Sequence, residues 1–359
     1  MKKSLIALAV LASSGAAMAQ SSVTIYGLAD VWVGSQKDTT GTTSAGSFAK
    51  MASDEGFATS RLGFKGTEDL GGGLKANFQI ETNVFFDSPG VQDKTPSPTS
   101  LGNRQAWVGL SGGFGEVQLG RVWTPYDDTR ALINDTFNAN FASSFNVWES
   151  YFDRTSNGIR YNTPSFGGLT GSVAYAFGED KTINSKASNL TSFSLNYANG
   201  PIAAGVAHQI EKDTNAAAGG IYADQTSLSG LLGATVSKRT YTLINGSYDL
   251  GVVKLLAGYN TVKATSTAVA GNAKANEFNV GAEVPLGSAL ALGVGYAESQ
   301  VELNGVDQNE NTGFSAVLRY SLSKRTFTYA GLTKQERETA AGAPITEKTR
   351  YFVGVSHSF

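Results

Sequence analysis

The two histidines are the side chains of this sequence whose chemistry could support acid–base catalysis or metal binding. His208 shares a strand face with apolar Val206 and Ile210, and His357 lies two residues before Phe359. Neither projects toward a Ser or Asp pair on a polar face, and the chain has no cysteine to act as a nucleophile or thiolate ligand. No glycine-rich phosphate-binding motif precedes a helix. We therefore expect no enzyme activity, no metal site and no cofactor.

Charged side chains of another kind are concentrated between Arg121 and Arg160, in the longest stretch without a two-residue alternation. Its acids are Asp127, Asp128, Asp135 and Glu149, with Asp153 beside Arg154. Connections this long are usually functional or disordered. Disorder is disfavoured because the aromatics of this stretch can bury enough surface to offset the entropy of ordering it. These aromatics are Trp123, Tyr126, Phe137, Phe141, Phe145, Trp148, Tyr151 and Phe152.

The segments around this stretch alternate between apolar and polar residues with period two. The clearest example is LKANFQIETNVFF, which places Leu74, Phe78 and Ile80 on one face and Gln79 and Glu81 on the other. Such alternation indicates β-strands with one face in an apolar medium and the other in a polar one. The pattern recurs to the C-terminus, where Tyr351, Val353, Val355 and Phe359 share a face.

The connections between these strands differ in length, and this difference indicates how the strands are arranged. Short turns containing Gly or Asp alternate with long polar loops, and counting the strands between them gives about 16. An even number of strands, with short turns at one end of the barrel and long loops at the other, is typical of outer-membrane barrels. We therefore predict an all-β, 16-stranded antiparallel transmembrane barrel, with the 121–160 stretch folded into its lumen. The region 211–237 is the least defined, because it could form a loop helix or an extra strand.

A soluble β-sandwich also produces period-two alternation, so three further features decide between the two architectures. The strands are roughly 10 residues long, which suits a tilted membrane strand better than a soluble one. Aromatics stand near strand ends, as in interfacial girdles, and the opposite faces are polar or small rather than bulky. These aromatics are Tyr197, Tyr248, Tyr320 and Phe359. The membrane barrel is the better interpretation.

The first 19 residues indicate export. Lys2 and Lys3 precede an apolar run, and Ala17-Met18-Ala19 has the small-x-small pattern of a cleavage site. We expect a signal peptide over 1–19 and one barrel domain over 20–359. Removing the two lysines leaves 26 basic against 30 acidic residues, so the mature formal charge is −4 and nucleic acid is not an expected partner.

Several motifs together resemble the trimeric general porins of Gram-negative outer membranes. They are SRLGFKG (60–66), GNRQAWVGL (102–110), GGFG (112–115), LGR (119–121) and the terminal YFVGVSHSF. The resemblance implies a diffusion channel for ions and small hydrophilic solutes in outer-membrane lipid, a third external loop folded inward as the constriction, and a homotrimer. It also implies that the outer-membrane assembly machinery recognises the C-terminal Phe359. The acidic PEFGG-type motif of enterobacterial porins is absent from this third loop.

In the porin family that this sequence resembles, arginines on the barrel wall face acids on the third external loop. By motif, Arg61 and Arg104 take the matching positions, with Arg154, Arg160 and Arg121 as further contributors and Lys65 extending the basic track. The acidic side would come from Asp127, Asp128, Asp135 and Glu149. Such opposed charges create a transverse field that orients polar solutes, and the density of arginines favours a mild anion preference.

Strand parity supports these arginines unequally. Leu62 and Phe64 are expected on the lipid face of their strand, and Arg61 has the opposite parity. Because a charge facing lipid costs about 2–4 kcal/mol, Arg61 should face the lumen. Arg104 shares parity with apolar residues and needs a bulge or a contact with the loop, and Arg121 needs a similar flip. For the loop acids, exposure to solvent remains an alternative to a role in the constriction. Asp127 and Asp128 are the better candidates for that role, because they follow the strand closely.

Two other functions stay open. A substrate-specific channel for sugars or organic anions would use the loop aromatics as a binding track, although many of them are needed to pack the loop. The long loops could also serve in adhesion or phage attachment, which is compatible with either kind of channel.

Overall fold

The computed structural model describes residues 22–53, 55–87, 101–183, 185–213, 228–232, 236–267 and 270–359. The predicted export signal and most of the region 211–237 lie outside these residues. Within 211–237 the short helix α5 (Leu228–Leu232) is described, which corresponds to the helical alternative for this region. Within the described ranges, no helix is both long enough and apolar enough to cross a membrane.

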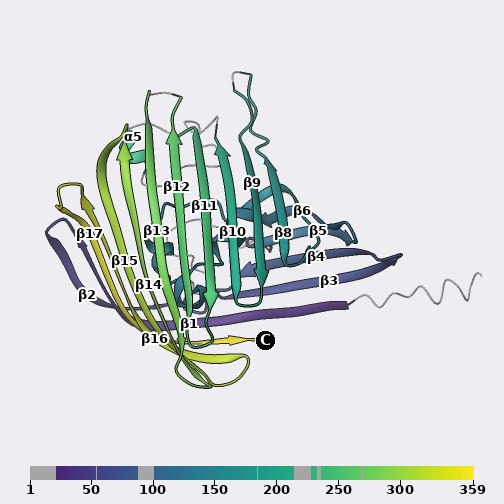
Figure 1. Cartoon of the computed structure of the whole chain (residues 1–359), viewed down its shortest axis with the longest axis horizontal. Helices are drawn as coiled ribbons and strands as arrows, with labels where there is room; N and C mark the ends of the chain where they lie inside the picture. Colours follow the sequence, from purple (N-terminus) through teal and green to yellow (C-terminus); the bar gives the residue numbers. More distant parts are fainter. Residues whose placement is uncertain are drawn as a thin grey trace, which may run out of the picture.

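The wall is one antiparallel sheet whose strands stand side by side (Figure 1). Its strands are β1 (Ser22–Thr40), β2 (Thr43–Ala52), β3 (Arg61–Gly71), β4 (Leu74–Asn83), β5 (Gln105–Gly112), β6 (Gly115–Trp123), β7 (Arg154–Asn162), β8 (Leu169–Phe177), β9 (Asn189–Asn199), β10 (Ile202–Lys212), β11 (Lys238–Asp249), β12 (Lys254–Thr265), β13 (Asn272–Pro285), β14 (Leu290–Leu303), β15 (Val306–Ser321), β16 (Thr326–Thr339) and β17 (Pro344–Ser358).

The sheet closes on itself because β1 pairs with β17 on one side and with β2 and β3 on the other. The first half of β1 pairs with β3, from Ser22↔Thr67 to Leu28↔Arg61, and the second half pairs with β2. β2 and β3 therefore occupy a single position in the wall, interrupted by residues 53–60. The described strands form a closed 16-strand antiparallel barrel, which confirms the predicted strand number and architecture.

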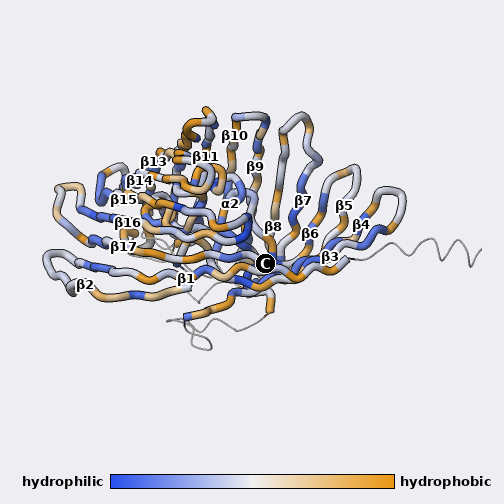
Figure 2. Tube along the Cα trace, turned by 90° about the horizontal axis from the view of Figure 1, so that it is seen from below, coloured by the Kyte–Doolittle hydropathy of each residue, from blue (hydrophilic) through white to orange (hydrophobic). Residues whose placement is uncertain are grey.

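Exposure alternates along the strands and places the large apolar side chains on one face. On β9, Phe193 and Leu195 are exposed while Ser192 and Ser194 are buried, and the same alternation of hydropathy runs along other strands (Figure 2). A soluble sandwich would bury such an apolar face against a second sheet. Here the apolar face points outward all round a single closed sheet, as in a membrane barrel.

Residues 124–153, called loop 3 below, join β6 to β7 through three short helices. They are α2 (Pro125–Arg130), α3 (Asp135–Asn138) and α4 (Ser143–Val147). Thr124 caps α2 by accepting a hydrogen bond from the Asp127 amide, and Pro125 fills the first helical position, where no amide donor is needed. The α2 helix ends after six residues, so its place depends on packing rather than on helix propensity.

Two aromatic clusters fix loop 3 to the wall. Near α2, the Tyr126 ring lies 4.8 Å from that of Tyr151 and 5.6 Å from that of Tyr241 on β11. Farther along the loop, the Phe141 ring stacks on Phe352 of β17, with centroids 3.7 Å apart. The core of the molecule therefore lies between loop 3 and the wall.

Candidate functional site

Loop 3 is hydrogen bonded to strands on several sides of the barrel. Asn245 of β11 donates to the Thr129 carbonyl at 2.6 Å, and Asn279 of β13 donates to the Ile133 carbonyl at 2.8 Å. The Asn140 amide donates to the carbonyl of Phe57, in the stretch between β2 and β3. On the wall strands, the contacting side chains belong to the face opposite the exposed apolar one.

A cavity of about 570 Å³ separates part of loop 3 from the wall, and we call it the charged cavity. Its basic residues come from three parts of the wall, and its acids come from loop 3. They are Arg61, Arg104, Arg154, Asp127, Asp128 and Asp153. Two predicted acids, Asp127 and Asp128, thus meet three predicted arginines, and Asp153 completes the acidic side.

Arg61 and Arg104 share an acidic neighbour on β4. The Arg104 Nε atom donates to Glu81 Oε1 at 2.6 Å, whereas the Arg61 guanidinium lies 4.0 Å from the same oxygen. Tyr26 donates to the other oxygen of Glu81 at 2.9 Å. Arg104 is also bonded to the Asn83 side chain at 3.1 Å, so its charge is more fully paired than that of Arg61.

Glu81 is the site residue that the sequence did not single out. Its place on the polar face of β4 was a usable signal, since that face had to point inward. Its pairing with Arg104 could not be inferred, because nothing in the sequence fixes the register of β4 against the stretch that precedes β5.

Arg154 and Arg160 lie at different points along β7 and contact different acids. The Arg154 guanidinium stacks on the Trp123 ring at 3.6 Å and pairs with Asp153 at 2.9 Å. Arg160 does not line the charged cavity, but it forms an ion pair with Asp128, which does. The Arg160 guanidinium also donates to the Trp123 carbonyl at 3.0 Å, which fixes it beside the start of loop 3.

The parity problem of Arg104 is resolved by the start of its strand. β5 begins at Gln105, so Arg104 precedes the regular alternation and turns toward Glu81. A register shift does occur near Arg121, between Gly120 and Val122. Arg121 nevertheless bonds to the Asn103 carbonyl and to Ser156, and it does not line the charged cavity.

Lys65 lies farther along β3 and is also absent from the charged cavity. Its ammonium is 5.3 Å from the centroid of the Tyr26 ring, and it lines a separate cavity with Trp107 and Glu116. The basic track that the sequence predicts from Lys65 is therefore separated from the arginines by the ring and hydroxyl of Tyr26.

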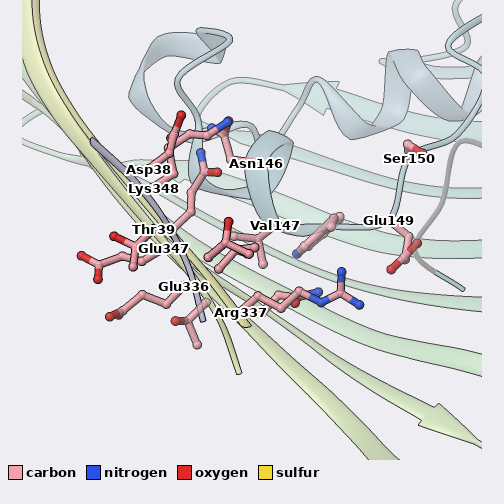
Figure 3. A pocket seen from close by; sticks show the side chains of 16 residues that line it. Asp38, Thr39, Asn146, Val147, Glu149, Ser150, Glu336, Arg337, Glu347 and Lys348 are labelled. Carbon is pink, nitrogen blue, oxygen red and sulfur yellow. The ribbon is translucent and has the colours of Figure 1, made fainter. Parts of the chain in front are cut away.

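Asp135 and Glu149 are the predicted acids that the structure does not bring to the charged cavity. Asp135 is fully buried and accepts hydrogen bonds from Ser143 and from Ser315 of β15, the latter at 2.6 Å. Burial raises the pKa of its carboxyl group. Glu149 lines a second cavity of about 510 Å³, where it lies apart from Asp38 and Lys348 (Figure 3).

Asp127 has the most perturbed environment of the acids that line the charged cavity. Burial, together with the nearby Asp153 carboxylate, raises the pKa of Asp127 to about 7. Its Oδ1 atom accepts a hydrogen bond from the Tyr151 hydroxyl at 2.5 Å, which opposes this rise. The charge on the acidic side of the cavity therefore depends on pH near neutrality.

The two histidines lie elsewhere. His208 contacts the hydroxyl of Thr242 at 2.9 Å, and His357 contacts that of Thr326 at 2.8 Å. Among the residues that the structure describes, no group of three or more His, Cys, Asp or Glu side chains could hold a metal ion.

Comparisons with known proteins place this geometry in context. Residues 4–340 match a family described as Gram-negative porin. Outer membrane porin protein 32 of Delftia acidovorans is 36% identical over 369 residues, covering 99% of this chain and 95% of that protein. Major outer membrane protein P.IB of Neisseria gonorrhoeae is 30% identical, covering 91% of each chain.

Solved structures share the fold. An anion-selective porin from Comamonas acidovorans has a TM-score of 0.76 and 27% sequence identity, covering 95% of this chain and 100% of that chain. OmpT of Vibrio cholerae, in its trimer form, has a TM-score of 0.68 over 94% of this chain and 99% of its own. At 14% identity, OmpT is similar in fold alone.

Proposed function

This chain belongs to the Gram-negative porin family and forms a diffusion channel of the outer membrane, and we propose that loop 3 lies in its lumen as the constriction. The hydrogen bonds from loop 3 to β11, β13 and the stretch before β3 support this placement, because only a segment inside the barrel reaches the inner face of all three. The charged cavity is then the narrow part of the water-filled path.

The charged cavity carries the proposed selection of solutes. Three arginines on the wall and three aspartates on loop 3 create a field across the passage. Ions and small hydrophilic solutes can exchange their hydration for these fixed charges, whereas apolar solutes cannot. Passive, general diffusion is the function that this arrangement supports best.

We infer a mild anion preference from the unequal pairing of the charges. Asp128 is held by Arg160 from outside the cavity, and the Asp127 carboxyl is partly protonated near pH 7. Arg61 faces the passage with its nearest acid 4.0 Å away, so its positive charge is the least compensated. The similar porin of Comamonas acidovorans is anion-selective, which agrees with this sign.

A substrate-specific channel for sugars is less well supported. Tyr126, Phe141 and Trp148 are buried in the contacts that hold loop 3 to the wall, so they cannot form a track for solutes. The organic-anion alternative keeps one supporting observation, which is the exposed ring of Phe145.

The test of the constriction is the reversal potential of Arg61→Ser in planar bilayers under a KCl gradient. Removing one unit positive charge at contact distance raises the energy of chloride and lowers that of potassium by about 1 kcal/mol each in a water-like medium, so the chloride-to-potassium permeability ratio should fall by up to roughly 30-fold. Arg325→Ser removes the same charge from an exposed turn and should leave the ratio unchanged. An unchanged ratio in Arg61→Ser would remove Arg61 from the constriction.

Family membership also supports a homotrimer, export through cleavage after Ala19, and recognition of Phe359 by the assembly machinery in outer-membrane lipid. We propose all three for this chain. Oligomer bands that resist SDS in the cold and convert to a monomer on heating would support the trimer, and a monomer extracted from native membranes without heating would contradict it.

A further inference from the structure

Phe145 is the exposed aromatic ring of loop 3. The residue is 38% exposed, whereas Tyr126, Phe141 and Trp148 are buried and the other aromatic residues of 124–153 are partly buried. It projects from α4 and lines the charged cavity. A large apolar side chain that faces water at the narrow part of a polar passage is not explained by packing of the loop.

The side of Phe145 that meets the loop is already occupied. The guanidinium of Arg130 lies 5.0 Å from the centroid of the Phe145 ring and is itself buried. Arg130 is held by a hydrogen bond to the Ser144 carbonyl at 2.8 Å and by the rings of Trp148 and Tyr151. The ring is therefore fixed from behind, and the remaining surface is presented to the cavity.

A second apolar surface faces the same cavity. Phe85, which follows β4, is half-buried and lines it, while the ring of Trp123 is covered by Arg154 at 3.6 Å. Phe85 and Phe145 come from distant parts of the chain, so their meeting at one cavity is a product of the fold.

Arg61 supplies an anion-binding group beside these rings. Its Nε atom donates to the Thr59 carbonyl at 3.1 Å, and its contact with Glu81 is 4.0 Å, too long for a hydrogen bond. Its terminal nitrogens therefore keep donors for a solute carboxylate. Arg104, by contrast, is engaged by Glu81 and Asn83.

We propose that the charged cavity contains a weak subsite for small aryl carboxylates, with the carboxylate on Arg61 and the ring against Phe145 and Phe85. The inference rests on the proposed channel function and names a preferred class of solute within it. The cavity volume of about 570 Å³ is within the range of small-molecule sites. Binding must be weak, because a channel has to release what it admits.

The experiment compares sodium benzoate with sodium acetate as inhibitors of KCl conductance through the full-length protein in planar bilayers. An aromatic contact should make benzoate effective at concentrations about two- to tenfold lower than acetate. Phe145→Ser should abolish this difference. Phe145→Leu, which keeps an apolar cover over Arg130, should abolish most of it while preserving the fold of the loop.

Phe166→Ser is the matched control, because Phe166 is exposed in the turn between β7 and β8, away from the cavity, and this variant should keep the difference. Equal effects of benzoate and acetate on the native protein, or an undiminished difference in both Phe145 variants, would overturn the aryl subsite. Stronger inhibition by glucose than by benzoate would overturn it in favour of a sugar site. If the native protein showed no KCl conductance at all, the channel function itself would be contradicted.

Discussion

The three arginines of the charged cavity carry the same charge but have different partners. Arg104 is buried against Glu81, and Arg154 stacks on Trp123 and pairs with Asp153. Buried charges require such partners, because desolvation without compensation is costly. Arg61 is held less tightly, so it remains available to passing solutes. We therefore expect that pairing, rather than presence in the cavity, decides how much each arginine contributes to selectivity.

The pKa of Asp127 predicts a pH-dependent selectivity. Burial and Asp153 raise this pKa to about 7, so the carboxyl is charged above and neutral below this pH. Loss of this negative charge leaves Arg61 and Arg154 less compensated, and reversal potentials should show a stronger anion preference at pH 5.5 than at pH 8.5. At both pH values, Asp127→Asn should show the reversal potential that the native protein shows at pH 5.5. A native protein with the same reversal potential at both would contradict the assignment.

At the scale of elements, the short helices of loop 3 depend on side chains from the wall. α3 contains Thr136 and Phe137 at positive φ values of 53° and 66°, which L-residues adopt only at some cost. The carboxylate of Glu283 on β13 accepts a hydrogen bond from the Phe137 amide at 2.8 Å. The conformation of α3 therefore depends on a side chain of the wall as well as on the loop's own sequence.

Phe141→Ala tests this dependence. The Phe141 ring is fully buried, stacks on Phe352 and meets Trp32 edge to face at 5.9 Å, so truncation should cost about 3–5 kcal/mol. We expect faster amide exchange in residues 124–153 and noisier open-channel currents, with the barrel intact. The control Phe166→Ala removes an exposed ring and should change neither. Unchanged exchange and noise in Phe141→Ala would show that this contact does not hold the loop.

At the scale of the whole molecule, closure of the barrel brings the first strand, β1, against the C-terminal end of the chain. The amides and carbonyls of Gly27 and Phe359 exchange hydrogen bonds of 3.1 Å. A Cβ atom on Gly27 would lie 2.3 Å from the Phe359 ring and 2.9 Å from the Arg61 carbonyl. The space beside Gly27 is therefore filled by the C-terminal ring of its own chain.

Gly27→Val should therefore weaken closure. The new side chain forces the Phe359 ring and the backbone apart, which should cost about 1–3 kcal/mol. We expect a lower temperature for conversion of the folded band to the unfolded band in SDS gels. Ala29→Val introduces the same residue on the same face, where Ala29 pairs with His357, and should change this temperature less. Equal behaviour of the two variants would show that Phe359 moves away freely.

The sequence by itself determined the wall. Period-two alternation depends only on which face each side chain takes, so it predicted the membrane barrel, the inward direction of Arg61 and the polar face that carries Glu81. The terminal apolar alternation ending at Phe359 likewise predicted the last strand. These features are local, because each strand carries its own alternation.

Only the tertiary structure decided how the site is assembled. Asp127 and Asp135 are both acids in one aperiodic loop, but one lines the charged cavity and the other is buried against Ser315, 180 positions away. Arg121 has the type and spacing of a site residue, yet a bulge directs it to Asn103. No period connects loop side chains to the wall, so these partners are set by packing between distant segments and cannot be read from neighbouring residues.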